Sequence, residues 1–185
     1  MIITAVAAVL GVLTLQVIPA DADLSSQPAM GISIRKPTKN DEWTFGGQGF
    51  FSNSALLVTH KVDTLSIDVS VQGKAGGMGY YDPKDAANSE FKNIASFQGV
   101  VDAKKLPSKP QKLPGGGASN VIAQFLDMTF KKDDKPMELK MWVFVGKQNQ
   151  NLYKVTMVCE EGVYKKHQKD ADYVLGSITT FREKN

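Results

Sequence analysis

The 185-residue sequence contains one cysteine and two histidines, and both scarcities exclude classes of site. A single thiol, at Cys159, forms no intramolecular disulfide and no zinc site built from thiolates. Only His60 and His167 are available for a site built from imidazoles. The sequence also has no Gly-x-Ser-x-Gly motif, the nucleophile elbow of many hydrolases. We therefore expect neither an enzyme nor a cofactor.

The overall composition is that of a soluble globular protein. Hydrophobic residues make up 42% of the chain and charged residues 22%, which excludes disorder, collagen and coiled coil as descriptions of the whole chain. The formal net charge of +3 is too small for a dedicated nucleic-acid-binding protein. The length fits one domain with a short N-terminal appendage.

The N-terminus has the features of an export signal. An apolar run from Ile2 to Leu15 has the length of a signal-peptide core, Pro19 follows it, and residues 20–22 form the small-x-small pattern of a cleavage site. We predict a signal peptide over residues 1–22, cleavage after Ala22, and a periplasmic or extracellular protein. No membrane span is expected after cleavage.

An uncleaved membrane anchor is the alternative interpretation of this segment. No lysine or arginine precedes the apolar run, although signal peptides normally begin with positive charge. However, a spanning helix needs about 20 apolar residues, and Gln16, Pro19 and Asp21 shorten this one. Because no cysteine follows the segment, a lipoprotein anchor is excluded.

The remaining chain is predicted to be a polar leader over residues 23–30 and a single domain over residues 31–185. Residues 31–37 read as a short strand, and the alternation of Trp43 and Phe45 predicts a second.

Residues 55–72 carry the clearest strand signal, which we interpret as a hairpin with its turn at residues 61–64. From residue 65 onward apolar and polar side chains alternate, so one face of the strand is expected to be buried and the other wetter. The apolar face contains Leu65, Ile67, Val69 and Val71, and the wetter face contains Ser66, Asp68, Ser70 and Gln72.

Two helices and three further strands complete the prediction. Asp82 and Pro83 are typical of a helix start, and apolar residues then recur at helical spacing over residues 83–97. Three apolar-rich runs predict an antiparallel meander, and helical spacing from Val163 to Phe181 predicts a final helix. The fold class is therefore α+β, a central antiparallel sheet flanked by helices. The runs of the meander are residues 121–131, 137–145 and 152–160.

Several segments resemble the PsbP-like family, within the Mog1/PsbP/DcrB superfamily. The opening segments ISIRKP and EWTF, the strand at residues 151–157 and the helix end at residues 174–181 carry this resemblance. It implies an α/β/α sandwich and a non-enzymatic accessory role in the cell envelope. Because the N-terminus lacks arginine and is not rich in serine, it does not read as a transit peptide, and we favour an exported bacterial member.

Residues 102–117 are rich in lysine, proline and glycine, and the prolines exclude a central strand. Part of the segment is expected to be an edge strand and the rest a loop. It reads as a basic arm able to bind an envelope protein or complex, or the anionic head groups of lipids; an ordinary solvated loop is the competing interpretation. The arm's candidate partner-binding residues are Lys104, Lys105, Lys109 and Lys112.

A small-ligand or lipid carrier is the second hypothesis, with a pocket between helix and sheet near Trp43, Tyr80 and Tyr81. The glycine-rich residues 73–79 lack the Gly-Lys-Ser/Thr of a phosphate-binding loop and the third glycine of a dinucleotide fingerprint, so we interpret them as a flexible connection.

The cysteine and the histidines are predicted to be structural. Cys159 shares a strand face with Tyr153 and Met157, so we expect a buried, inert thiol. His60 falls at a strand end and His167 on the apolar stripe of the last predicted helix. Nothing in their spacing indicates a metal site, and none is predicted.

Overall fold

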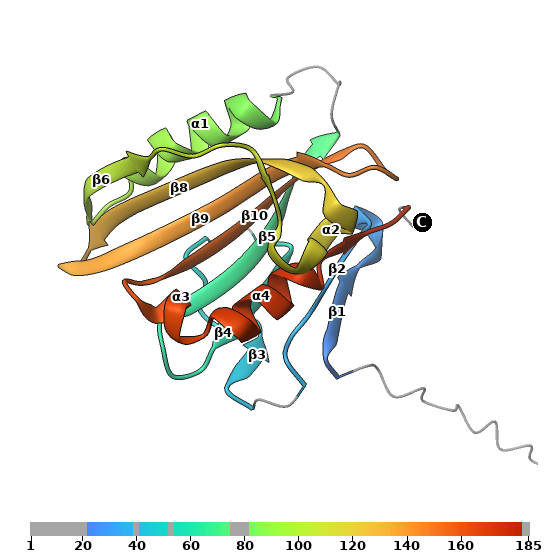
Figure 1. Ribbon diagram of the computed structural model, residues 1–185, viewed down its shortest axis with the longest axis horizontal. Helices are drawn as coiled ribbons and strands as arrows, with labels where there is room; N and C mark the ends of the chain where they lie inside the picture. The colour runs from blue at the N-terminus through green and yellow to red at the C-terminus, as the bar shows by residue number, and fades with distance from the viewer. Residues whose placement is uncertain (1–21, 39–40, 52–53, 75–81, 183–185) are drawn as a thin grey trace, which may run out of the picture.

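The computed structural model describes residues 22–38, 41–51, 54–74 and 82–182 (Figure 1). The predicted signal peptide, except for Ala22, lies outside these residues. None of the helices in the described part of the chain has the length and apolar character of a membrane-spanning helix.

A large antiparallel sheet forms the centre of the molecule (Figure 1). Its strands follow the order β3-β4-β5-β10-β9-β8-β6, and β7 also pairs with β8. The predicted hairpin is confirmed as β4–β5 and the predicted meander as β8–β9–β10. The strands are β3 (Trp43–Phe45), β4 (Leu56–His60), β5 (Leu65–Lys74), β6 (Val100–Leu106), β7 (Gln111–Lys112), β8 (Ile122–Lys132), β9 (Lys135–Val145) and β10 (Asn151–Glu160).

Helices and a small second sheet surround the large one. The small sheet has the order β1-β2-β11. These elements are β1 (Leu24–Gln27), η1 (Pro28–Met30), β2 (Ile32–Arg35), α1 (Pro83–Ala95), η2 (Pro114–Gly116), α2 (Gly117–Asn120), α3 (Val163–Lys166), α4 (Gln168–Gly176) and β11 (Thr179–Thr180).

The large sheet buries side chains on both faces, so the protein has two hydrophobic clusters. On one face α1 contributes Ala87 and Ile94 to a cluster with β8 and β9. On the other face α4 contributes Val174 and Leu175 to a cluster that also contains β4, β5, β10 and the small sheet. Figure 1 shows α1 and α4 on opposite sides of the sheet. The predicted fold class, an α+β sandwich with a central antiparallel sheet, is confirmed.

Helix α1 begins as the sequence predicts. The Asp82 side chain accepts a hydrogen bond from the Asp85 backbone N–H at 2.8 Å, and Pro83 occupies the first turn. Both features stabilise a helix N-terminus. The helix ends at Ala95, two residues before the predicted end.

Most of the face of β5 predicted to be wetter is buried instead, and only Gln72 at its end is exposed. Ser66, Asp68 and Ser70 are each at most 8% exposed. Lys154, which pairs with Ser70 across the sheet, forms an ion pair with Glu90 of α1 on this side. Alternation correctly separates the two faces of a strand, but it does not reveal that a second layer covers the polar one.

Two boundaries differ from the prediction at the ends of the domain. Residues 24–27 of the predicted polar leader form β1, which pairs with β2, so the leader is part of the fold. The final predicted helix is divided at His167 into α3 and α4, and residues 179–180 form β11 against β2. Ile178 is fully buried although it lies outside a helix, which explains why helical spacing extended the prediction too far.

Candidate functional site

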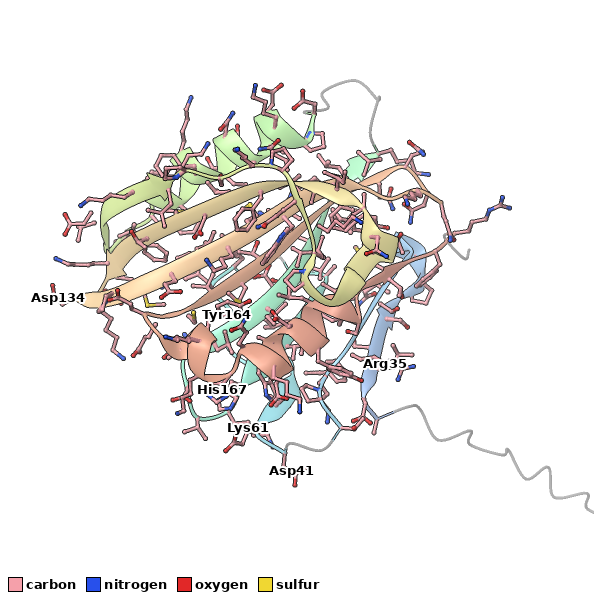
Figure 2. The ribbon with its side chains drawn as sticks, viewed as in Figure 1. Arg35, Asp41, Lys61, Asp134, Tyr164 and His167 are labelled. Carbon is pink, nitrogen blue, oxygen red and sulfur yellow. The ribbon has the colours of Figure 1, made fainter. Side chains whose placement is uncertain are left out.

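Two histidines that are 107 positions apart lie in contact at one end of the molecule. The ring centroids of His60 and His167 are 4.2 Å apart, with the ring planes tilted by 41°. Trp43 meets both rings edge-on, at 5.3 Å from His60 and 6.4 Å from His167. Figure 2 shows His167 near Lys61, the residue that follows His60.

The end of β4 and the turn after it hold the His60 ring in place. Its Nδ1 accepts hydrogen bonds from the backbone N–H of Asp63 at 3.0 Å and of Val62 at 3.4 Å. Because Nδ1 accepts, the proton of the neutral ring lies on Nε2. Nε2 therefore donates to Glu42 Oε2, which is 3.2 Å away.

The junction between α3 and α4 positions His167. Its backbone has φ −107° and ψ 18°, which interrupts the helix and makes His167 the N-cap residue of α4, with a side chain that makes no capping hydrogen bond. The His167 Nε2 atom lies 2.6 Å from Asp63 Oδ2, and the Lys166 ammonium lies 2.7 Å from the same oxygen. The hydrogen bonds from Lys166 and His167 lower the pKa of Asp63 to about 2. A carboxylate that is ionised near neutral pH thus orients the imidazole.

His60 borders a groove of about 670 Å³. The groove runs from the β4–β5 turn past the 47–50 segment to the β8–β9 turn, with Leu65 and Val158 among its apolar lining residues. Its rim is charged, with lysines and carboxylates interspersed. The charged lining residues are Lys61, Asp63, Lys132, Asp133, Lys135 and Glu160.

The four lysines predicted to bind a partner follow the β6 edge of the large sheet. Lys104 and Lys105 lie on β6, Lys112 lies on β7, and Lys109 lies between the two strands. All four are exposed. The ion pairs found among the described residues include none of the four.

Of the three residues predicted to line a ligand pocket, the structure describes only Trp43. Trp43 is 1% exposed and belongs to the hydrophobic cluster beneath the histidines. Tyr80 and Tyr81 lie outside the described residues, as does most of the glycine-rich segment 73–79.

Cys159 is fully buried, which confirms the sequence prediction. It lies in the same cluster as Tyr153 and Met157. Burial raises the pKa of its thiol to about 11. The thiol is therefore neutral near pH 7, where a reactive cysteine would need a thiolate.

Sequence reasoning missed the carboxylates that complete the site. Glu42 and Asp63 fall in turns, where a charge usually signals only solvent exposure. The register of β3 against β4, with Trp43 opposite His60, brings Glu42 beside the His60 ring. Only the antiparallel pairing of these two short strands could have indicated that Glu42 lies beside His60.

The fold is similar to solved structures that share little sequence with this chain. PsbP of Synechocystis sp. PCC 6803 (CyanoP) is 12% identical, with a TM-score of 0.54, over 88% of this chain and 95% of that one. LpqN of Mycobacterium tuberculosis, involved in cell envelope biogenesis, is 15% identical with a TM-score of 0.48, over 89% and 87%. A Bacteroides thetaiotaomicron protein is 14% identical with a TM-score of 0.48, over 89% of this chain and 50% of that one.

The likeness to cyanobacterial PsbP defines the fold as PsbP-like, as the sequence resemblance implied. No family model matches the sequence, and no curated protein matches it significantly. At 12% identity the likeness concerns the fold, so the role of each residue has to be argued from this chain itself.

Proposed function

We propose that this chain is an exported, non-catalytic accessory protein that binds an acidic partner protein in the cell envelope. The contact surface is the basic edge, which we define as Lys104, Lys105, Lys109 and Lys112 along β6 and β7. The observation that carries the proposal is that these exposed lysines form none of the ion pairs found among the described residues, which leaves their positive charge for a partner.

Other lysines close to this edge are neutralised within the protein. Lys131 of β8 pairs with Asp102 at 2.9 Å, and Lys140 of β9 pairs with Asp127 at 3.0 Å. On the basic edge, Lys105 instead donates to the neutral Asn88 side chain at 2.8 Å. Positive charge therefore accumulates along the edge, where it steers an acidic surface toward the protein.

Apolar side chains accompany the lysines on these strands. Val101 is 55% exposed, Leu106 is 37% exposed and Ile122 is 68% exposed. Val101 and Leu106 lie on β6, and Ile122 pairs with Lys112. A mixture of exposed apolar groups and charge is typical of a protein contact surface rather than of a purely solvated loop.

The start of the fold supports the export part of the proposal. The predicted cut after Ala22 leaves β1 complete, because β1 begins at Leu24. It also keeps Asp23, whose carboxylate lies 3.2 Å from the Lys36 ammonium. Export is tested by the intact mass of the protein recovered from its native host, which should begin at Asp23.

Charge reversal tests the basic edge. We expect replacement of its four lysines by glutamate to abolish crosslinking, in the native compartment, to the acidic protein captured by a photo-crosslinker at the exposed position of Gln111 on β7. The matched control reverses four exposed lysines elsewhere, Lys84, Lys92, Lys165 and Lys169, and changes the net charge equally. Loss of crosslinking in both variants, or in neither, would contradict the proposal. Binding of the chain to anionic vesicles, with no protein crosslinked, would also contradict it.

A small-ligand carrier is the alternative function, and the groove beside His60 favours it. Its volume of about 670 Å³ is within the range of small-molecule sites. Native mass spectrometry of the protein purified from its host tests this alternative. An added mass that is lost on denaturation would support a carrier, and the bare chain mass would oppose it.

A further inference from the structure

We propose that Glu42, His60 and His167 form a binding site for a divalent transition-metal ion of the zinc class. One potential ligand atom from each residue lies within 4.8 Å of the other two. The three come from the segment before β3, the end of β4 and the α3–α4 junction, so the fold itself assembles them. This inference is independent of the proposed role of the basic edge.

The separations are close to those of a bound site. Zinc–nitrogen and zinc–oxygen bonds of about 2.0–2.2 Å in a tetrahedron place neighbouring ligand atoms about 3.4 Å apart. His60 Nε2 and Glu42 Oε2 are already 3.2 Å apart. The Glu42 side chain is 53% exposed, so it can adjust without disturbing the core. The three ligand atoms, which lie within 4.8 Å of one another, therefore need to move only a short distance toward a shared ion.

Asp63 prepares His167 for this role. Its carboxylate lies 2.6 Å from Nε2, which leaves Nδ1 as the nitrogen for the metal. A carboxylate that accepts the other ring proton orients a metal-bound imidazole and increases its basicity.

Metal binding at His60 has a structural consequence in the turn after β4. In the structure, Nδ1 accepts hydrogen bonds from the N–H groups of Val62 and Asp63. Coordination of a metal through Nε2 would move the ring proton to Nδ1, which could then no longer accept them. The turn must release these hydrogen bonds when the metal binds. The amides of residues 62 and 63 therefore report on occupancy.

The donor set selects the class of metal. Two imidazoles and one carboxylate suit zinc and its transition-metal neighbours, whereas magnesium and calcium require oxygen ligands. Three protein ligands leave the fourth position of a tetrahedral ion open to a ligand from outside the protein. Water occupies such an open position in zinc sites with three protein ligands.

Calorimetric titration of the metal-free mature chain with zinc chloride tests the proposal. We expect one ion per chain, and at least tenfold weaker binding in each of the variants His167→Gln and Glu42→Gln. The control variant Glu161→Gln, an exposed carboxylate outside the site, should bind like the wild type. Magnesium chloride should give no binding heat.

Amide NMR spectra provide a second measurement that does not depend on the heat of binding. Zinc should shift the Val62 and Asp63 amides of the wild type and leave those of His60→Gln unchanged, with circular dichroism confirming that this variant is folded. Zinc binding that survives in the double variant H60Q/H167Q would overturn the proposal, as would no binding at millimolar zinc. The basic-edge variant should bind zinc normally, so the two proposals fail separately.

Discussion

At the scale of single residues, Asp68 is the least satisfied group in the described structure. It is fully buried on β5, and neither carboxylate oxygen has a hydrogen-bond partner among the described residues. Burial raises its pKa from 3.8 to about 7, although the charge of Lys154 and the Ser54 hydroxyl act in the opposite direction. A carboxyl group in this position is more easily buried in its neutral form.

We predict that Asp68 makes the protein less stable as the pH rises from 4 to 7. Over this range the unfolded chain releases the Asp68 proton while the folded chain retains it, so ionisation favours unfolding. The shift from 3.8 to about 7 corresponds to about 4 kcal/mol. The variant Asp68→Asn should lose this part of the pH dependence in urea unfolding between pH 4 and pH 8. An unchanged slope, or an equal change in the exposed control Asp41→Asn, would contradict the assignment.

At the scale of elements, the N-terminus of α1 is specified by its own sequence. The Asp82 side chain satisfies the Asp85 N–H, one of the backbone groups that a helix leaves without an internal partner. This helix covers one face of the sheet and contributes Ala87 and Ile94 to the hydrophobic cluster with β8 and β9. The stability of the helix therefore contributes to the stability of that cluster.

We predict that Asp82→Ala destabilises the protein by about 1 kcal/mol, because it removes the cap. Asp82→Asn keeps a side-chain oxygen that accepts the same hydrogen bond, and it should cost much less. The free energy of unfolding in urea measures both. Equal losses in the two variants would show that the charge of Asp82, rather than its hydrogen bond, stabilises the helix.

At the same scale, the β6–β7 edge has features that hinder its pairing with strands of other chains. Asp102 has a φ of 55°, and the register between β6 and β8 shifts between Val101 and Lys104. A bulge and exposed lysines both hinder uncontrolled pairing of an edge strand with another chain. The same lysines that we propose to bind a partner thus also protect the edge from aggregation.

At the scale of the whole molecule, one hydrogen-bond network joins the small sheet to the large one. The Tyr153 hydroxyl of β10 donates to the Met30 carbonyl, and the Asn149 side chain donates to the Phe181 carbonyl at 2.8 Å. Gly31 lies between them with a φ of 62°, and a Cβ there would fall 2.4 Å from the Phe181 oxygen. The two ends of the domain therefore meet where only glycine fits.

We predict that Tyr153→Phe destabilises the protein by about 1–2 kcal/mol, because it removes a buried donor and leaves carbonyl groups of the small sheet less satisfied. Amide exchange should increase first in β1 and β2. The control Tyr173→Phe, at a residue 46% exposed, should have little effect on either measurement. A uniform increase in exchange over both sheets would argue against a local role for the network.

The sequence alone determined the features that depend on near neighbours along the chain. Alternation located β5 and the hairpin, capping residues located the start of α1, and three apolar runs located the meander. The prediction of a buried thiol at Cys159 succeeded for the same reason, since one strand face is shared by alternate residues. Local spacing is sufficient for such features because neighbouring residues are held together by the backbone.

Only the tertiary structure decided which distant residues meet. It buried the polar face of β5, divided the final helix at His167 and brought that residue against His60. Each outcome depends on which layer covers a strand and on how segments far apart in the chain pack. Periodicity carries no information about the element on the other side of a contact. The contact between His60 and His167, on which the proposed metal site rests, was therefore not predictable from the sequence, whereas the lysines of the basic edge were.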